Sequence, residues 1–176
     1  MDESSIIENA NEAASTHDTP VLREIAPDEA ARLRPCLKAL ADHHNRVSVH
    51  FRGSYPKAPF DETIERFRRE LAGGASHIAV IETGGSVLGF CKVDVRGGQG
   101  GLGSLDYLVV LPGHRGQGLG DALMGWALER FEAAGVADVD VKVADGNDAV
   151  TFYERYGFRP NAHILRLSHV REGRDA

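Results

Sequence analysis

The sequence has few of the residues on which disulfide-rich and metal-centred domains depend. Its 176 residues include two cysteines, Cys36 and Cys91, and these do not form the C-x-x-C pair of a zinc or redox motif. No apolar run approaches the roughly 20 residues that cross a bilayer. We therefore expect no disulfide framework, no metal site and no membrane segment, and we expect both cysteines to be packing residues.

The sequence also has no excess of basic over acidic residues. Asp and Glu number 26 against 20 Lys and Arg, which gives a formal net charge of -6. An extended nucleic-acid surface would need the opposite balance, so we expect no nucleic-acid partner. The segment Met1–Asn11 is acidic and lacks the basic and apolar blocks of a secretory signal. A cytoplasmic location is the expectation.

The chain has the length of one ordinary domain. Residues 1–20 are polar with few large apolar side chains, which is typical of a flexible tail. We expect one folded domain over residues 21–170 and a flexible C-terminus over residues 171–176.

Apolar spacing and turn residues predict an α/β domain. Its first part is expected to begin with a strand at Val21–Ile25 and a helix from Pro27 to His43, whose Leu33, Leu37 and Leu40 face inward. A polar loop from His43 to Pro59 and a helix capped by Asp61 that stops at Gly73 should follow. A hairpin of His77–Glu82 and Val87–Val95 and a third antiparallel strand at Leu105–Leu111 complete this part.

The second part of the domain has the order of a parallel crossover. It is expected to contain a long helix from about Gly120 to Gly135, a strand at Val139–Val143, a short helix from Asp148 to Tyr156 with Asn147 as its N-cap, and a closing strand at Ala162–His169.

A strand, a tight loop and a helix start follow one another between Leu108 and Gly120. The letters LVVLPGHRGQGLG place three glycines around the first turn of the helix. Amides at a helix start have no partner within the helix, and the helix dipole adds positive charge. Glycines let a phosphate approach this backbone closely, and Arg115 can add a charged contact. The pattern predicts an anion site.

This segment resembles the cofactor motif of the GNAT superfamily of N-acetyltransferases, in which a strand ending in V-x-P precedes R-G-x-G-x-G. The resemblance is strongest between Leu105 and Phe158. It implies the GNAT-like acyl-CoA N-acyltransferase fold, with a mixed sheet flanked by helices, and acetyl-CoA as the acyl donor. It also implies that the donor is bound by the strand backbone of Leu108, Val109 and Val110 and by the loop and helix start Arg115, Gly116, Gln117, Gly118, Leu119, Gly120 and Asp121.

A second segment, from Asn147 to Phe158, resembles another motif of that family. The distance from Asn147 to Tyr153 is one residue shorter than is usual there, whereas Tyr153 matches in its distance from Gly157 and Phe158. The resemblance implies that Asn147 and Tyr153 contact the coenzyme and that the Tyr153 hydroxyl protonates the departing thiolate. The alternative is a tyrosine that only packs at a helix end.

An amine must lose a proton before it attacks, because an alkylammonium with a pKa of about 10 is not nucleophilic at neutral pH. Asp106 is the first candidate for the base, since period-two alternation would put it on the same face as Leu108 and Val110. Asp140, Glu82, Asp94 and water are the alternatives, as is a merely solvent-exposed Asp106.

The expected activity is transfer of an acetyl group from acetyl-CoA to a primary amine by direct attack, with a small molecule as acceptor. The loop between the first two helices, from His43 to Pro56, would wall the acceptor site. A non-catalytic acyl-CoA sensor and an acetyltransferase of protein or peptide amines remain alternatives. GNAT-like domains often dimerise, so a homodimer is one option for the assembly.

Overall fold

Five strands form one sheet in the computed structural model, which describes residues 19–96 and 100–162. The strands are β1 (Val21–Glu24), β2 (Ser76–Thr83), β3 (Ser86–Arg96), β4 (Leu102–Val110) and β5 (Asp138–Val141). They lie in sequence order, the first four antiparallel and β5 parallel to β4. The predicted mixed sheet is confirmed.

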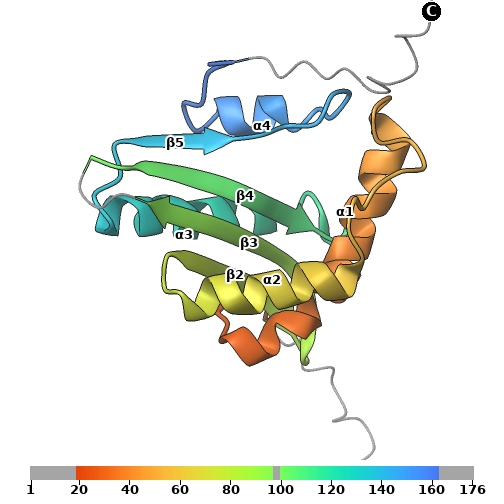
Figure 1. The fold of residues 1–176 in the computed structure, drawn as a ribbon, viewed down its shortest axis with the longest axis horizontal. Coiled ribbons are helices and arrows are strands. Elements are labelled where there is room, and N and C mark those ends of the chain that lie inside the picture. Colours follow the sequence, from red (N-terminus) through yellow and green to blue (C-terminus); the bar gives the residue numbers. More distant parts are fainter. Residues whose placement is uncertain (1–18, 97–99, 163–176) are drawn as a thin grey trace, which may run out of the picture.

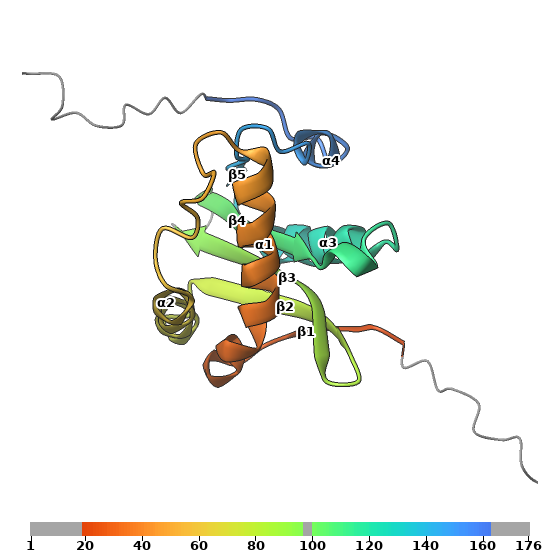
Figure 2. The same cartoon turned by 90° about the vertical axis from the view of Figure 1, so that its right-hand side faces the viewer.

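Helical segments cover both faces of this sheet (Figures 1 and 2). They are the 3-10 helix η1 (Pro27–Leu33), α1 (Arg34–Val47), α2 (Phe60–Ala72), the 3-10 helix η2 (Pro112–His114), α3 (Leu119–Ala133) and α4 (Val150–Glu154). In Figure 2, α2 and α3 lie on opposite sides of the strands, and α1 crosses in front of their ends. Among the described residues, no helix is long and apolar enough to cross a membrane.

The core consists of two apolar layers, one on each face. The layer beneath η1, α1 and α2 includes Leu33, Phe67 and Phe90, and the layer beneath α3 includes Cys91 and Phe131. Cys36 and Cys91 are both fully buried and unpaired, so their predicted packing role is confirmed. Burial raises the pKa of the Cys36 thiol to about 12 and raises that of Cys91 further.

The first predicted helix differs from the structure at both ends. Its first part is the separate 3-10 helix η1. Helix α1 follows from Arg34 and has Pro35 in its first turn, where the missing N–H of proline cannot continue the hydrogen bonding of η1. Helix α1 ends at Val47 and not at His43, so residues 44–47, expected in the loop, are helical and the loop starts at Ser48. The inward positions are correct: Leu33 and Leu37 are buried and Leu40 packs against them.

Asp61 is not the cap of α2. The N-cap position is Pro59, and Asp61 lies in the first turn, where its carboxylate pairs with Arg34 of α1. A carboxylate in the first turn still complements the helix dipole, so the sequence signal indicated the correct helix end but not the role of the residue.

One extra residue in β4 changes which side chains share a face. Tyr107 pairs with Lys92 and Leu105 pairs with Val93, so Asp106 has no partner of its own. This β-bulge shifts the alternation by one residue. Leu105 and Leu108 therefore both lie in the layer beneath α3, while Tyr107 packs in the layer beneath α2.

Several predicted features lie outside the described residues. They are residues 1–18 of the expected tail, the closing strand after Ala162, and the expected flexible end at residues 171–176.

Beside the bulge, a fully buried ammonium group joins three carboxylates. The Lys92 Nζ lies 2.5 Å from Asp94 Oδ1, 2.8 Å from Asp106 Oδ2 and 3.2 Å from Glu70 Oε2 of α2. Burial alone would lower the pKa of Lys92, but its hydrogen bonds to Asp106 and Asp94 outweigh burial and hold the pKa above its ordinary value. Lys92 is therefore a buried cation that balances acids from α2, β3 and β4.

We expect Lys92→Met to destabilise the fold by about 3–5 kcal/mol, because it leaves the buried carboxylate of Asp94 and the partly buried ones of Glu70 and Asp106 without their cation. Urea unfolding measures this loss. The control is Lys38→Met, which removes an exposed pair with Asp42 and should cost less than about 1 kcal/mol. Equal effects of the two substitutions would contradict the assigned role of Lys92.

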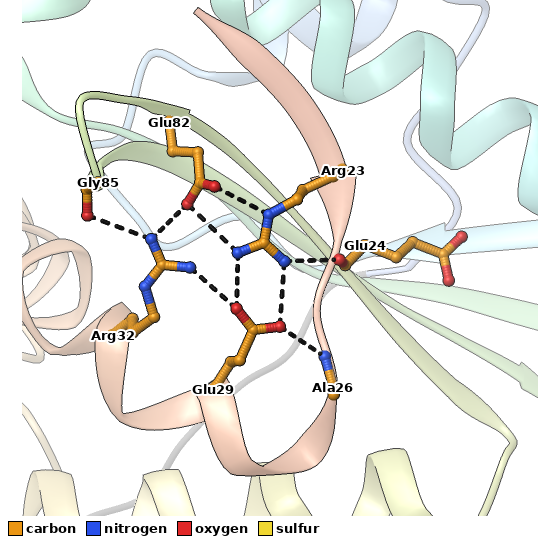
Figure 3. A network of polar contacts seen from close by, with 7 residues as sticks. All are labelled: Arg23, Glu24, Ala26, Glu29, Arg32, Glu82 and Gly85. Carbon is orange, nitrogen blue, oxygen red and sulfur yellow. Dashed lines mark hydrogen bonds and ion pairs between the residues drawn. The ribbon is translucent and has the colours of Figure 1, made fainter.

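A second charged network ties η1 to β1 and β2 (Figure 3). Arg23 binds Glu29 at 2.6 Å and Glu82 at 2.8 Å, and Arg32 also binds both acids. The hydrogen bond from Arg23, together with one from the N–H of Ala26, lowers the pKa of Glu29 from 4.5 to about 2. It also lowers the pKa of Glu82.

This network predicts a specific acid sensitivity. Because the pKa of Glu29 is lower in the folded state, its contribution to stability is complete above pH 4.5 and is lost as the pH falls towards about 2. In thermal melts across this window, Glu29→Gln should show a smaller fall in melting temperature with pH than the unsubstituted protein. Parallel curves for the two proteins would refute the assignment.

Candidate functional site

The pairing of β4 with β5 covers only part of β4. Leu102 to Leu105 pair with Asp138 to Val141, and no strand among residues 19–96 and 100–162 pairs with the same edge beyond Leu105. The backbone of Leu108, Val109 and Val110, predicted to bind the donor, lies in this free stretch. An extended ligand can bind to such an edge as an added strand would.

The loop after β4 ends at the start of α3. Gly116 and Gly118 have φ values of 75° and 78°, a left-handed conformation that side chains disfavour, and a Cβ on either glycine would meet no atom within 4 Å. Ala122 donates to the carbonyl of Gly118, so the amides of Leu119 to Asp121 precede the first helical hydrogen bond. The open backbone at a helix start fits a phosphate group.

The side chains of this loop bond mostly to its own backbone. Arg115 Nε donates to the carbonyl of Val110 at 3.1 Å, and Gln117 Nε2 lies 3.5 Å from the carbonyl of Gly113. Within the described part of the chain, the terminal nitrogens of Arg115 make no hydrogen bond, so its charge is available beside the glycines.

Two residues near α4 engage the carboxylate of Asp121. Arg155 donates to Asp121 Oδ1 at 2.9 Å, and the Tyr156 hydroxyl donates to the same oxygen. These bonds balance a negative charge at the start of α3, where it would repel a phosphate. Sequence reasoning missed Arg155, because nothing local indicates a contact over 34 residues.

Tyr153 lies in the layer beneath α3 and is 9% exposed. Its ring contacts those of Phe152 and Phe158, at centroid distances of 5.4 Å and 5.7 Å. Burial raises the pKa of its phenol to about 12. Within the described residues its hydroxyl makes no hydrogen bond, so the group keeps its proton at neutral pH without donating it to the protein.

Asn147 is not the N-cap of α4, contrary to the sequence prediction. That position is Ala149, whose N–H donates to Asn147 Oδ1 at 3.1 Å. The same oxygen lies 3.4 Å from His43 Nε2 of α1. Asn147 therefore caps the turn that precedes α4 and also contacts α1.

Asp106 does not share a face with Leu108 and Val110, because the bulge reverses the alternation after it. Its carboxylate accepts hydrogen bonds from Lys92 and from Ser104, at 2.8 Å and 2.6 Å, on the side that faces α2. The Asp106 side chain is 28% exposed, and Asp140 is an exposed residue.

The other two candidate bases also bind cationic partners. Glu82 binds Arg23 and Arg32. Asp94 binds Lys92, Ser76 and Arg96, and it is buried. Of the four candidates, Asp106 and Asp140 are the two exposed residues, whereas the Glu82 side chain is 18% exposed and Asp94 is buried.

Three aromatic rings gather where α1 meets the following loop. The His44 ring stacks on Phe51 at 5.4 Å, and Tyr55 meets both rings edge-on. Burial lowers the pKa of His44, which favours its neutral form. Across residues 19–96 and 100–162, no three His, Cys, Asp or Glu side chains form a group that could hold a metal ion.

Known proteins resemble this chain in fold. An N-acetyltransferase related to GCN5 from Ralstonia eutropha JMP134 superposes with a TM-score of 0.67 and 21% identity, covering 85% of this chain and 98% of that one. An aminoglycoside N-acetyltransferase in complex with CoA gives 0.66 and 15%, over 85% and 94% of the two chains. A ribosomal-protein-alanine N-acetyltransferase from Brucella melitensis biovar Abortus 2308 gives 0.61 and 17%, over 85% and 99%.

At these identities the likeness establishes the fold. The sequence itself also matches the family description of the acetyltransferase (GNAT) domain, over residues 74–160, which include the hairpin, the glycine loop, α3 and α4. The chain belongs to the GNAT family of acetyltransferases.

Proposed function

We propose that this protein transfers an acetyl group from acetyl-CoA to a primary amine of a small molecule. The observation that carries the proposal is the direct succession of the free edge of β4, the left-handed glycines and the start of α3. An extended ligand that ends in a phosphate group needs a free strand edge for its extended part and, next to it, an open helix start for the phosphate. A structural neighbour with this fold is an aminoglycoside N-acetyltransferase in complex with CoA.

In this proposal the backbone binds most of the donor. The amides from Gly116 to Asp121 bind the pyrophosphate, with Arg115 as the adjacent cation. The edge of β4 from Leu108 to Val110 binds the pantetheine arm. Both glycines lie in open space, so a phosphate can approach the backbone without a steric clash.

The chemical step is proposed to be direct attack by the amine. Both cysteines are buried and their thiol pKa values are raised, so neither forms the thiolate that an acyl carrier needs. Tyr153 is the proposed proton donor to the departing thiolate. Its phenol carries a proton throughout the neutral range because its pKa is about 12.

Asp106 is the proposed base, either directly or through water, with Asp140 as the alternative. Lys92 and Ser104 fix the orientation of the Asp106 carboxylate by hydrogen bonds to its two oxygens. The fixed carboxylate could accept a proton from a water molecule between it and the amine.

Gly118→Asp should weaken CoA binding at least tenfold, about 1.4 kcal/mol, because it puts a carboxylate in the space proposed for the pyrophosphate. Gly118→Ala separates backbone strain from charge, and Gly125→Asp adds the same charge farther along α3. Titration calorimetry with CoA measures all three. A folded Gly118→Asp protein with unchanged affinity would overturn the assignment of the loop.

Tyr153→Phe should lower kcat about 100-fold or more with little change in CoA affinity, because it removes the proton donor. The fold should tolerate the change, since the hydroxyl makes no hydrogen bond within the described residues. Thiol release from acetyl-CoA across a panel of amines measures the rate. Tyr156→Phe is the control: it removes a hydroxyl that bonds to Asp121 at the start of α3, so any effect should fall on CoA affinity and leave kcat at saturating acetyl-CoA within about twofold.

If the unsubstituted protein binds CoA tightly but acetylates no amine in a broad panel, a non-catalytic acyl-CoA sensor replaces the proposal. If peptide amines are acetylated and small amines are not, the acceptor is a protein.

A further inference from the structure

The end of α1 is bonded to the segment that leads into α4. The hydroxyl of Ser48, which is fully buried, donates to Asp145 Oδ1 at 2.5 Å and accepts the N–H of Phe51 at 3.2 Å. The N–H of Val49 donates to Asp145 Oδ2 at 3.1 Å. Both carboxylate oxygens of Asp145 thus bind the first turn after α1.

The two residues after Asp145 extend this contact. A Cβ on Gly146 would lie 2.3 Å from the carbonyl oxygen of Val47, so the two backbones touch. Gly146 also has a φ of 71°, which side chains disfavour. Asn147 then reaches His43 of α1. Asp145, Gly146 and Asn147 therefore all lie against the last turn of α1.

The loop on the other side of the contact is itself bonded to α1. The side chain of Asn45 donates to the carbonyl of Tyr55 at 2.7 Å and accepts its N–H at 3.0 Å. His44 packs on Phe51 and Tyr55. Residues 48–55 therefore form a compact loop, and the first turn of this loop is hydrogen-bonded to Asp145.

Only a short turn separates the contact from Tyr153. The N–H of Ala149 bonds to Asn147, and the N–H of Tyr153 donates to the carbonyl of Ala149 at 3.2 Å. A chain of direct contacts thus runs from the loop after α1 through Asp145 and Asn147 to the backbone of Tyr153.

We propose that Asp145 is a positioning residue, which couples the loop at residues 48–55 to α4 and thereby fixes the place of Tyr153. The inference rests on the proposed function for the role of Tyr153, although the coupling itself does not require it. Movement of the loop at residues 48–55 would then change where the Tyr153 hydroxyl lies. This loop, which is expected to wall the acceptor site, and the proposed proton donor would therefore move together.

Amide hydrogen exchange tests the coupling in the protein without ligands. The reporters are the amides of Tyr55 in the loop and Tyr153 in α4, with the amide of Ala134, the C-cap of α3, as a distant reference. In Ser48→Ala and in Asp145→Asn, both reporters should exchange about three to ten times faster, because each substitution removes a hydrogen bond of the contact. The reference amide should not change.

The matched control is Asp148→Asn, which removes a charge closer to α4 from a side chain that makes no hydrogen bond within the described residues. It should leave both reporters unchanged. If Ser48→Ala accelerates exchange at Tyr55 but not at Tyr153, the coupling is refuted. Faster exchange of Tyr153 in Asp148→Asn would also refute it, because the effect would then not be specific to the contact.

A second measurement addresses positioning. With acetyl-CoA and an amine that the unsubstituted protein acetylates, Asp145→Asn should lower kcat about three- to tenfold and leave CoA affinity within about twofold, since the glycine loop is elsewhere. Loss of CoA affinity with unchanged kcat would overturn the positioning role. If no amine is acetylated, the proposed function fails, and the exchange measurement still decides the coupling.

Discussion

The early end of the pairing between β4 and β5 is the constraint on which the candidate site depends. A strand inside a sheet normally has both edges bonded, and its backbone polar groups are costly to leave without partners. Beyond Leu105 and Val141, β4 keeps β3 on one side and has no strand on the other within the described residues. The free edge leads directly into η2 and the glycine loop. In the proposed function, an extended ligand with a phosphate at one end would pair with the free edge of β4 and bind the open amides of the glycine loop.

The bulge at Asp106 is the second constraint, and it acts on the side chains. Without it, regular alternation would put Asp106 on the face that carries Leu108 and Val110. With the extra residue, Asp106 turns towards Lys92, and Leu108 and Val110 pack beneath α3. The free edge therefore begins where the strand is irregular and where a buried cation fixes a carboxylate. The cost of burying Lys92 is offset by three acids, so this part of the sheet combines local irregularity with strong electrostatic restraint.

Features with local causes could be predicted from the sequence. The hairpin, the mixed sheet, the long helix α3 and the glycine loop all follow from apolar spacing and from glycines near helix and strand ends. The bulge could not be predicted, because no residue near Asp106 indicates that β4 has one more residue than its partner strand at this point. The end of α1 was predicted too early because Ser48 and Asn45 are stabilised by contacts with Asp145 and Tyr55, and Asp145 is 97 residues from Ser48. Polar residues at the end of α1 are typical of a loop in the sequence, although their contacts with Asp145 and Tyr55 stabilise the last helical turn.

The short spacing between Asn147 and Tyr153 has a structural explanation. Asn147 contacts His43 of α1 and the turn before α4, so its position is set by α1 and by that turn. Tyr153 is also held from its C-terminal side, where the N–H of Phe158 donates to its carbonyl at 3.3 Å and the Phe158 ring packs against it. The distance to Gly157 and Phe158 is the one that matches the family, and it is also the one with direct contacts to Tyr153. The shorter spacing therefore affects the link between Asn147 and Tyr153, whereas the contacts of Tyr153 with Phe158 lie on the side where the spacing matches the family.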